Sequence, residues 1–165
     1  MTKLKILGKV VKYGDDVNTD LIIPGKYLVF TDSKELAKHA MEGIDPPFIK
    51  KSKDAIIVAG KNFGCGSSRE QAPIALKYSG TRAIVAKSFA RIFYRNAINI
   101  GLPVLECEDL WDMVRDGDQL MLDLKSGKIT NLTSNASIKA QHLPYFILEL
   151  IEIGGLLNKL KRAKV

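Results

Sequence analysis

The sequence predicts one mixed α/β domain, in which helices flank a small mixed sheet or barrel. Short apolar stretches with the two-residue period of β-strands alternate along the chain with stretches of helical period. A length of 165 residues fits one domain, and 46% hydrophobic with 26% charged residues is typical of a globular protein with a packed core. This composition excludes disordered, collagen-like and disulfide-scaffold proteins.

Six short strands are expected, and their shortness indicates a small sheet or barrel. Their predicted ranges are 5–11, 55–59, 83–86, 103–105, 119–124 and 128–132. Ser126-Gly127 lies between the last two strands and predicts a hairpin there.

Four helices are expected between and after these strands. The first begins at the capping-box pattern of residues 32–35 and stops at Gly43 and Pro46-Pro47. The second runs from about 68 to 78, and the third starts after 88 and ends before 101. The last helix follows Pro144 and is expected to fray or bend at Gly154-Gly155.

The chain is basic, with a formal net charge of +7. Four of the positive charges lie near its end, at Lys159, Lys161, Arg162 and Lys164. We interpret this run as a solvated helix end, whose cations suit the helix dipole, rather than as a nucleic-acid site.

The first residues, MTKLKILGKVVKYG, lack the apolar core of a secretion signal, and no stretch is long and apolar enough for a membrane span. We therefore expect a soluble, cytoplasmic protein without membrane contact. Cys65 and Cys107 are expected to be free thiols, because disulfides are rare in that compartment.

Two polar, glycine-bearing stretches interrupt the regular pattern, and we expect the chemistry there. They are residues 13–25 (YGDDVNTDLIIPG) and 60–69 (GKNFGCGSSR), which we call the first and second loop. The aspartates of DDVNTD in the first loop suit a hard metal ion or catalytic work, but the stretch lacks the glycine and glutamate of a calcium-binding loop. An Asx-rich turn is the alternative.

The second loop leads from a strand into a helix. Ser67 or Ser68 is expected to be the N-cap, so that free N–H groups and the helix dipole favour an anion. Arg69 adds a planar fork of donors that matches a carboxylate. A tight turn with an ordinary serine cap is the alternative, and the glycine spacing fits neither a P-loop nor a dinucleotide fingerprint. Cys65, beside a cation and a helix start, is a candidate nucleophile.

Lys87, Arg91 and Arg95 recur at intervals of four residues and predict a basic stripe on the third helix. Such a stripe is either a solvated face or the lining of an anion site.

Three segments together resemble the swivel domain of the aconitase family: 18–25 (NTDLIIPG), 64–70 (GCGSSRE) and 80–92 (GTRAIVAKSFARI). Their order and spacing are similar to those of the stand-alone small subunits of isopropylmalate isomerases in their short form. The resemblance covers essentially the whole chain. It implies a swivelling β/β/α domain that closes over a separate large subunit.

In that family, three cysteines of the large subunit hold a [4Fe–4S] cluster, whose open iron binds the hydroxyl and a carboxylate of the substrate. This chain has only 2 cysteines and cannot supply three thiolates. The resemblance therefore implies that the chain is inactive alone and binds no cluster itself. Self-association of the isolated chain is left open.

By resemblance, Ser67 takes the place of the family's base, an alkoxide-forming serine that removes the proton from the carbon next to a carboxylate. Ser68 and Arg69 would hold that carboxylate, and Asp20 would orient the serine or the cluster-bound hydroxyl. A serine is a poor base in water, so such a site needs a water-poor pocket with donors aimed at the oxyanion.

Residues 27–30 (YLVF) match the family's specificity loop. Val29 and Phe30 would hold an isopropyl group, whereas relatives such as homoaconitase, whose substrate has a further carboxylate, carry Arg near position 29. Residues 26–53 are expected to be mobile until a large subunit binds. Cys65 stands where aconitases proper tend to carry an acid, and the resemblance assigns it no chemistry.

The expected activity is the interconversion of 2-isopropylmalate and 3-isopropylmalate through isopropylmaleate in leucine biosynthesis. Related hydro-lyases remain alternatives, acting on 2-methylmalate and citraconate, dimethylmalate, methylthioalkylmalate or homoaconitate. From other classes, a non-enzymatic anion- or RNA-binding module and a thiol enzyme using Cys65 also remain open.

Overall fold

The computed structural model describes residues 3–164, which form one seven-stranded sheet with strand order β4-β3-β2-β1-β5-β6-β7. The strands are β1 (Lys5–Lys12), β2 (Ala55–Ala59), β3 (Ala83–Ala86), β4 (Val104–Glu106), β5 (Gln119–Asp123), β6 (Lys128–Asn131) and β7 (Ala136–Lys139). Strands β1 to β4 pair in parallel, and β5 to β7 add antiparallel neighbours on the other side of β1.

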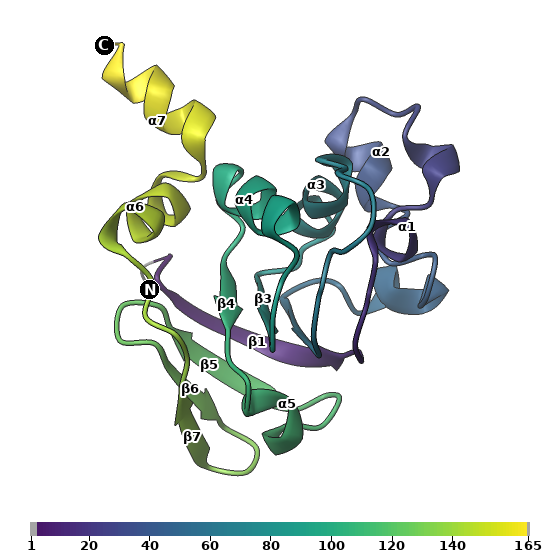
Figure 1. The fold of residues 1–165 in the computed structure, drawn as a ribbon. Coiled ribbons are helices and arrows are strands. Elements are labelled where there is room, and N and C mark those ends of the chain that lie inside the picture. The colour runs from purple at the N-terminus through teal and green to yellow at the C-terminus, as the bar shows by residue number, and fades with distance from the viewer. Residues whose placement is uncertain (1–2, 165) are drawn as a thin grey trace.

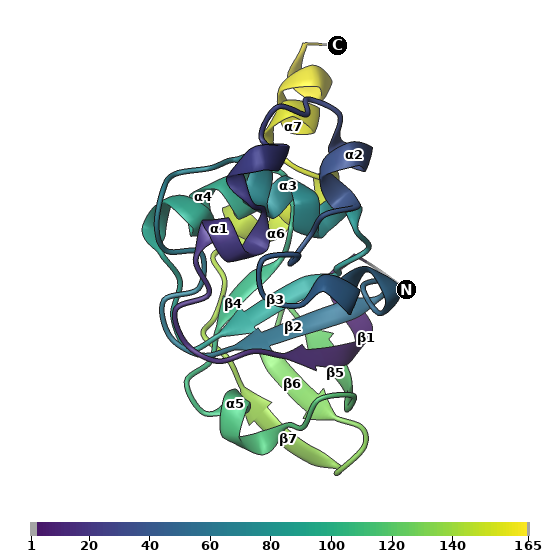
Figure 2. The same cartoon turned by 90° about the vertical axis from the view of Figure 1, so that its right-hand side faces the viewer.

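The helices are α1 (Thr19–Ile22), α2 (Ser33–Ala37), α3 (Gln71–Tyr78), α4 (Arg91–Asn99), α5 (Leu110–Met113), α6 (Tyr145–Ile153) and α7 (Leu156–Ala163), with 3₁₀ helices at Gly25–Tyr27 and Pro46–Lys50. Figures 1 and 2 show α1 to α4 and α6 on one side of the parallel strands, while β5 to β7 curl away beneath them. Every residue of β2 and β3 is buried, which is typical of parallel strands covered on both faces.

The predicted fold class is confirmed, and all six predicted strands are present, with β4 lying one residue later than expected. The hairpin at Ser126-Gly127 is also confirmed, because Asp123 pairs with Lys128 across it. Strand β7 was not predicted. Its sequence, ASIK, has one large apolar residue, and the strand lies half-exposed at the sheet edge.

The predicted start of the second helix is wrong. Helix α3 begins at Gln71, and its N-cap is Glu70 in helical conformation without a side-chain cap, so neither Ser67 nor Ser68 caps it. The preceding residues instead turn toward the first loop, where the Thr19 hydroxyl donates to the Ser67 carbonyl at 2.9 Å. A hydrogen bond between two residues that are distant in sequence, Thr19 and Ser67, therefore forms here in place of the expected local cap.

The predicted basic stripe is also wrong in one member. Helix α4 begins at Arg91, so Lys87 lies before the helix, directly after β3. The Lys87 ammonium lies 3.7 Å from a carboxylate oxygen of Asp112 in α5. Only Arg91 and Arg95 share the helix.

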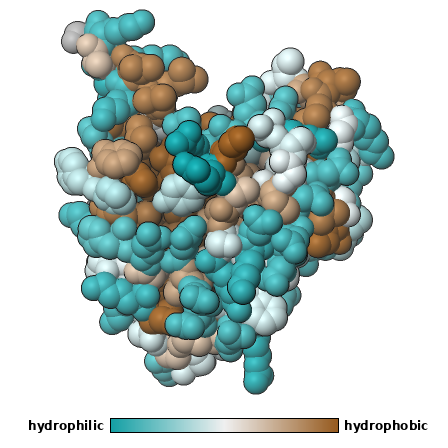
Figure 3. All heavy atoms as spheres, in the orientation of Figure 1, coloured by the Kyte–Doolittle hydropathy of each residue, from teal (hydrophilic) through white to brown (hydrophobic). Residues whose placement is uncertain are grey.

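The predicted bend at Gly154-Gly155 is a complete break between α6 and α7. Both glycines have positive φ, of 91° and 110°, and Gly154 is the left-handed C-cap of α6. Helix α7 has no buried residue and projects from the body of the protein in Figure 1. In Figure 3 apolar surface is visible on this projecting helix, where Leu157 and Leu160 are exposed. Within residues 3–164, no helix combines the length and apolarity needed to cross a bilayer.

Candidate functional site

The two polar loops pair with each other at the carboxyl ends of β1 and β2. Four backbone hydrogen bonds of 2.8–3.0 Å join them, from Gly60 to Gly14, from Asp16 to Lys61, from Gly64 to Val17 and from Thr19 to Cys65. Parallel strands bring their carboxyl ends to the same edge of a sheet, so loops distant in sequence meet there. This edge is the usual position of ligand sites in such sheets.

The first two aspartates of the first loop hold the second loop in place. Asp15 Oδ1 accepts from the Lys61 N–H at 2.7 Å, and Asp16 Oδ1 accepts from the Asn62 amide at 3.2 Å. The three aspartates serve separate contacts and do not converge on one point, as a metal site built from DDVNTD would require. Among the residues that the structure describes, no three His, Cys, Asp or Glu side chains gather as a metal site.

A third segment, which follows β3, extends the same edge. Phe63 N–H donates to the Ser88 carbonyl at 3.0 Å, and Ala90 N–H donates to the Phe63 carbonyl at 2.9 Å. Helix α4 follows, and its Phe93 ring packs directly on Gly64, where a Cβ atom would lie 2.2 Å from the ring Cγ. With φ at +82°, Gly64 also has a backbone conformation that favours glycine. This contact brings α4 against the second loop.

A cavity of about 500 Å³ lies between the second loop and α4. Its lining consists of Thr19, Gly64, Gly66, Ser67, Ser68, Arg69, Ala90, Arg91, Ile92, Phe93, Arg95 and Asn96. Ser67 and Ser68 are exposed, and within residues 3–164 the N–H groups of residues 66–69 find no backbone acceptor. Unpaired N–H groups beside arginines favour an anion, so the anion-site interpretation of this loop fits the geometry although the helix cap is absent.

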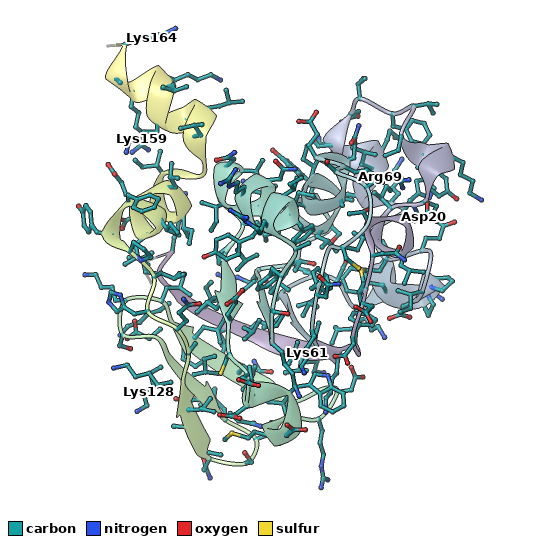
Figure 4. The ribbon with its side chains drawn as sticks, viewed as in Figure 1. Asp20, Lys61, Arg69, Lys128, Lys159 and Lys164 are labelled. Carbon is teal, nitrogen blue, oxygen red and sulfur yellow. The ribbon has the colours of Figure 1, made fainter. Side chains whose placement is uncertain are left out.

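Arg69, the last residue of the second loop, pairs with Asp20 of the first loop (Figure 4). One guanidinium nitrogen, Nη1, donates to Asp20 Oδ1 and to the Ile23 carbonyl, both at 3.1 Å. The Arg69 side chain is 21% exposed and that of Asp20 69% exposed. Asp20 therefore contacts the arginine, whereas the Ser67 hydroxyl lies 3.5 Å from that of Thr19.

Thr19 is a site residue that sequence reasoning missed. It is 2% exposed, begins α1, and donates to the Ser67 carbonyl. The available signal was the position of Thr19 in the NTD triplet of residues 18–20, but only the Asp20 carboxylate of that triplet was considered as a site group. A buried hydroxyl that bonds the backbone of the second loop fixes where Ser67 stands.

Arg91 and Arg95 supply unneutralised charge at the cavity. Both line it from α4, both are exposed, and neither forms an ion pair with a carboxylate in the described part of the chain. The charge of Arg69 is offset by Asp20. The positive charge at the cavity therefore comes mainly from α4. For Arg91 and Arg95, this agrees with the interpretation of the basic stripe as the lining of an anion site.

The Cys65 thiol does not have the environment of a nucleophile. Burial, together with the negative charge of Asp16, raises the pKa of this thiol, whereas a reactive cysteine requires a lowered pKa. This environment argues against the thiol-enzyme alternative. Cys65 and Cys107 are both free, as expected.

The predicted specificity residues lie outside the cavity lining. Val29 is 80% exposed on the connection between the 3₁₀ helix Gly25–Tyr27 and α2. Phe30 is half-buried and stacks at 6.0 Å, centroid to centroid, on the ring of His39. Both side chains thus lie on the segment that precedes α2, outside the cavity.

Residues 10–109 match the aconitase C-terminal domain. The chain belongs to the aconitase family. This family assignment confirms the resemblance that the NTD, GSSRE and SFARI segments indicated.

Curated aconitase-family relatives match this chain over almost their full lengths. The 3-isopropylmalate dehydratase small subunit of Halothermothrix orenii is 55% identical over 159 residues, which are 96% of each chain. The isopropylmalate/citramalate isomerase small subunit of Methanocaldococcus jannaschii is 53% identical, covering 95% of this chain and 94% of the relative. A crystal structure of 3-isopropylmalate dehydratase from the same organism superposes with a TM-score of 0.91 at 52% identity, covering 97% of this chain and 95% of that one.

Proposed function

We propose that this chain is the small subunit of a hydro-lyase that interconverts 2-isopropylmalate and 3-isopropylmalate through isopropylmaleate, in the cytoplasmic pathway to leucine. The observation that carries the proposal is sequence identity. Over nearly the full length of the chain, about half of the residues are identical to those of small subunits named for this reaction. The anion-favouring cavity between the second loop and α4 supports it, because each malate carries two carboxylates.

In this proposal Ser67 is the base, and its Oγ takes the proton from the carbon next to a substrate carboxylate. The deprotonated serine needs donors nearby, and the unpaired N–H groups of residues 66–69 are available. Thr19 positions the serine through its bond to the Ser67 carbonyl. Ser67 is exposed in the isolated chain, so a covering surface must first exclude water.

Ser68 and Arg69 would bind that carboxylate. Because Asp20 and Ile23 use only Nη1 of Arg69, the other guanidinium nitrogens are left to donate to substrate. Asp20 then acts by orienting Arg69. Arg91 and Arg95 are placed to attract the second carboxylate or to balance its charge.

The covering surface would belong to a large subunit that carries a [4Fe–4S] cluster. When bound, such a cluster supplies a Lewis acid at the hydroxyl that leaves or enters. Cys65 and Cys107 are the only cysteines of this chain, too few to hold the cluster. The contribution of this chain is therefore the base, the carboxylate donors and the enclosure of substrate.

A second candidate substrate is 2-methylmalate (citramalate), because one relative is named an isopropylmalate/citramalate isomerase small subunit. We propose that Val29 and Phe30 meet the substrate tail once the large subunit closes over the site. An apolar contact discriminates by only about 1–3 kcal/mol per methylene group. One enzyme can therefore accept both the isopropyl and the methyl tail.

The test is to combine the chain with its cluster-loaded large subunit and to measure kcat/KM on 2-isopropylmalate and 2-methylmalate. We expect activity only with both subunits present, and a higher kcat/KM on 2-isopropylmalate. Ser67→Ala in the same complex is expected to lose nearly all turnover. Ser137→Ala, a substitution of an exposed serine on β7, is its control. A complex that assembles yet turns over neither malate would refute the proposal, and a preference for 2-methylmalate would favour the second candidate.

A further inference from the structure

Two ring side chains outside the cavity, those of Tyr27 and His39, meet at the carboxylate of Glu42. The Tyr27 hydroxyl donates to Glu42 Oε1 at 2.5 Å, and His39 Nδ1 lies 2.7 Å from Glu42 Oε2. The rings of Tyr27 and His39 stack at 3.7 Å between centroids, with 7° between their planes. Glu42 therefore ties the end of one 3₁₀ helix to the turn after α2 with both of its oxygens.

This cluster holds both ends of the short stretch that carries Val29. Tyr27 is at one end, and Phe30 at the other end stacks at 6.0 Å on the face of His39. Between them the backbone is closed by hydrogen bonds of 3.1 Å from Leu28 to Gly25 and from Phe30 to Tyr27. With its neighbours anchored, Val29 is left as an 80% exposed tip.

The electrostatics of the cluster agree with this geometry. Hydrogen bonds from Tyr27 and His39 hold the pKa of Glu42 below its usual range, and the bond to Glu42 raises the pKa of Tyr27. The carboxylate is therefore ionised near neutral pH and accepts strong, charge-assisted bonds. Lys26, whose ammonium lies 5.1 Å from the Tyr27 ring, is the nearby cation.

We propose that Tyr27, His39 and Glu42 are positioning residues, which hold residues 27–30 in the conformation that presents Val29 to the tail of the substrate. The part of this inference that concerns the substrate rests on the proposed function. The part that concerns the ordering of residues 27–30 does not. A side chain that distinguishes an isopropyl from a methyl group must be held in place, because a loose contact discriminates poorly. The cluster therefore sets substrate preference without touching the reacting atoms.

The first experiment measures amide hydrogen exchange of the isolated chain, which needs no activity. Glu42→Ala and Tyr27→Phe are expected to lower the protection of the Leu28 and Phe30 amides about tenfold, the effect of losing one charge-assisted hydrogen bond. Lys38→Ala is the matched control, because Lys38 lies on the same segment and bonds only to Glu35. Unchanged protection in both cluster variants would overturn the proposal.

The second experiment measures kcat and KM of the complex on 2-isopropylmalate and 2-methylmalate. Glu42→Ala is expected to lower the ratio of kcat/KM for 2-isopropylmalate to kcat/KM for 2-methylmalate about tenfold. The loss should come from a higher KM for 2-isopropylmalate, with kcat nearly unchanged. Glu42→Gln, which keeps an acceptor for Tyr27, should restore most of the ratio. Equal losses on both substrates would mean a merely structural role. If the wild-type complex turns over neither malate, the proposed function fails while the exchange result still decides the ordering role.

Discussion

Gly64→Ala tests the packing that brings α4 to the second loop. Gly64 has φ at +82°, and a non-glycine residue there costs about 1–2 kcal/mol. The added methyl would also lie 2.2 Å from Cγ and 2.4 Å from Cβ of Phe93, a side chain that is 2% exposed. Phe93 meets Phe63 edge to face at 5.3 Å and stacks on Phe89 at 6.3 Å, both between ring centroids, so it has little room to move. Overpacking of this kind costs about 1–3 kcal/mol.

We therefore expect Gly64→Ala to lower the free energy of unfolding by about 2–5 kcal/mol, out of the roughly 5–15 kcal/mol that a domain possesses. Urea denaturation at unchanged m value measures this loss. Gly117→Ala isolates the backbone cost, because Gly117 has φ at +90° with nothing within 4 Å of the added Cβ. Gly14→Ala, with the same open space and no positive φ, should change stability by less than about 0.5 kcal/mol. A loss at Gly64 equal to that at Gly117 would refute the Phe93 contact.

The remaining predictions concern the site, the hairpin and the segment before β2. Ser67→Ala should assemble with the large subunit but lose nearly all turnover, and wild-type kcat would remove Ser67 as the base. Val29→Arg should raise kcat/KM for malates with a γ-carboxylate relative to 2-isopropylmalate, and an unchanged ratio would show that residue 29 does not meet the substrate tail. Asp118→Ala should lower stability by about 1–3 kcal/mol near neutral pH, because the buried Asn131 amide loses its 2.8 Å acceptor. Hydrogen bonds from the Arg115 backbone and from Asn131 hold the pKa of Asp118 below its usual range. The difference in stability should therefore persist above the ordinary aspartate pKa and shrink as the pH falls through the lowered one, and a difference independent of pH would contradict this. In the isolated chain, residues 26–53 should exchange their amides faster than Ala55–Ala59, and equal protection would speak against a mobile segment.

The central strands were predictable because their sequence carries one consistent signal. The stretches AIIVA and AIVA are apolar throughout and bounded by polar residues, and their ranges agree with β2 and β3. Strand β7 and the short helices α1 and α5 offer four residues each. Segments this short depend on tertiary contacts, which local pattern does not contain.

The site was predictable in its residue types but not in its contacts. Glycines, serines and an arginine in the second loop indicated an anion site, and the cavity there is lined by them. The pairing of Asp20 with Arg69, which are 49 residues apart, and the bond from Thr19 to the second loop depend on the register between β1 and β2. The same register determines that Ser67 bonds Thr19 rather than capping α3.

The charge arrangement of the cavity explains why this chain needs a second subunit in the proposed reaction. Arg69 is balanced by Asp20, while Arg91 and Arg95 remain unpaired and exposed beside an exposed Ser67. In water, these arginines are screened, and a serine hydroxyl stays protonated and is a poor base. Covering the cavity with an apolar, water-excluding surface would strengthen the field of both arginines at the serine and at a dianionic substrate. In the proposed reaction, the isolated chain would hold the donors in place and closure of the partner would make them effective.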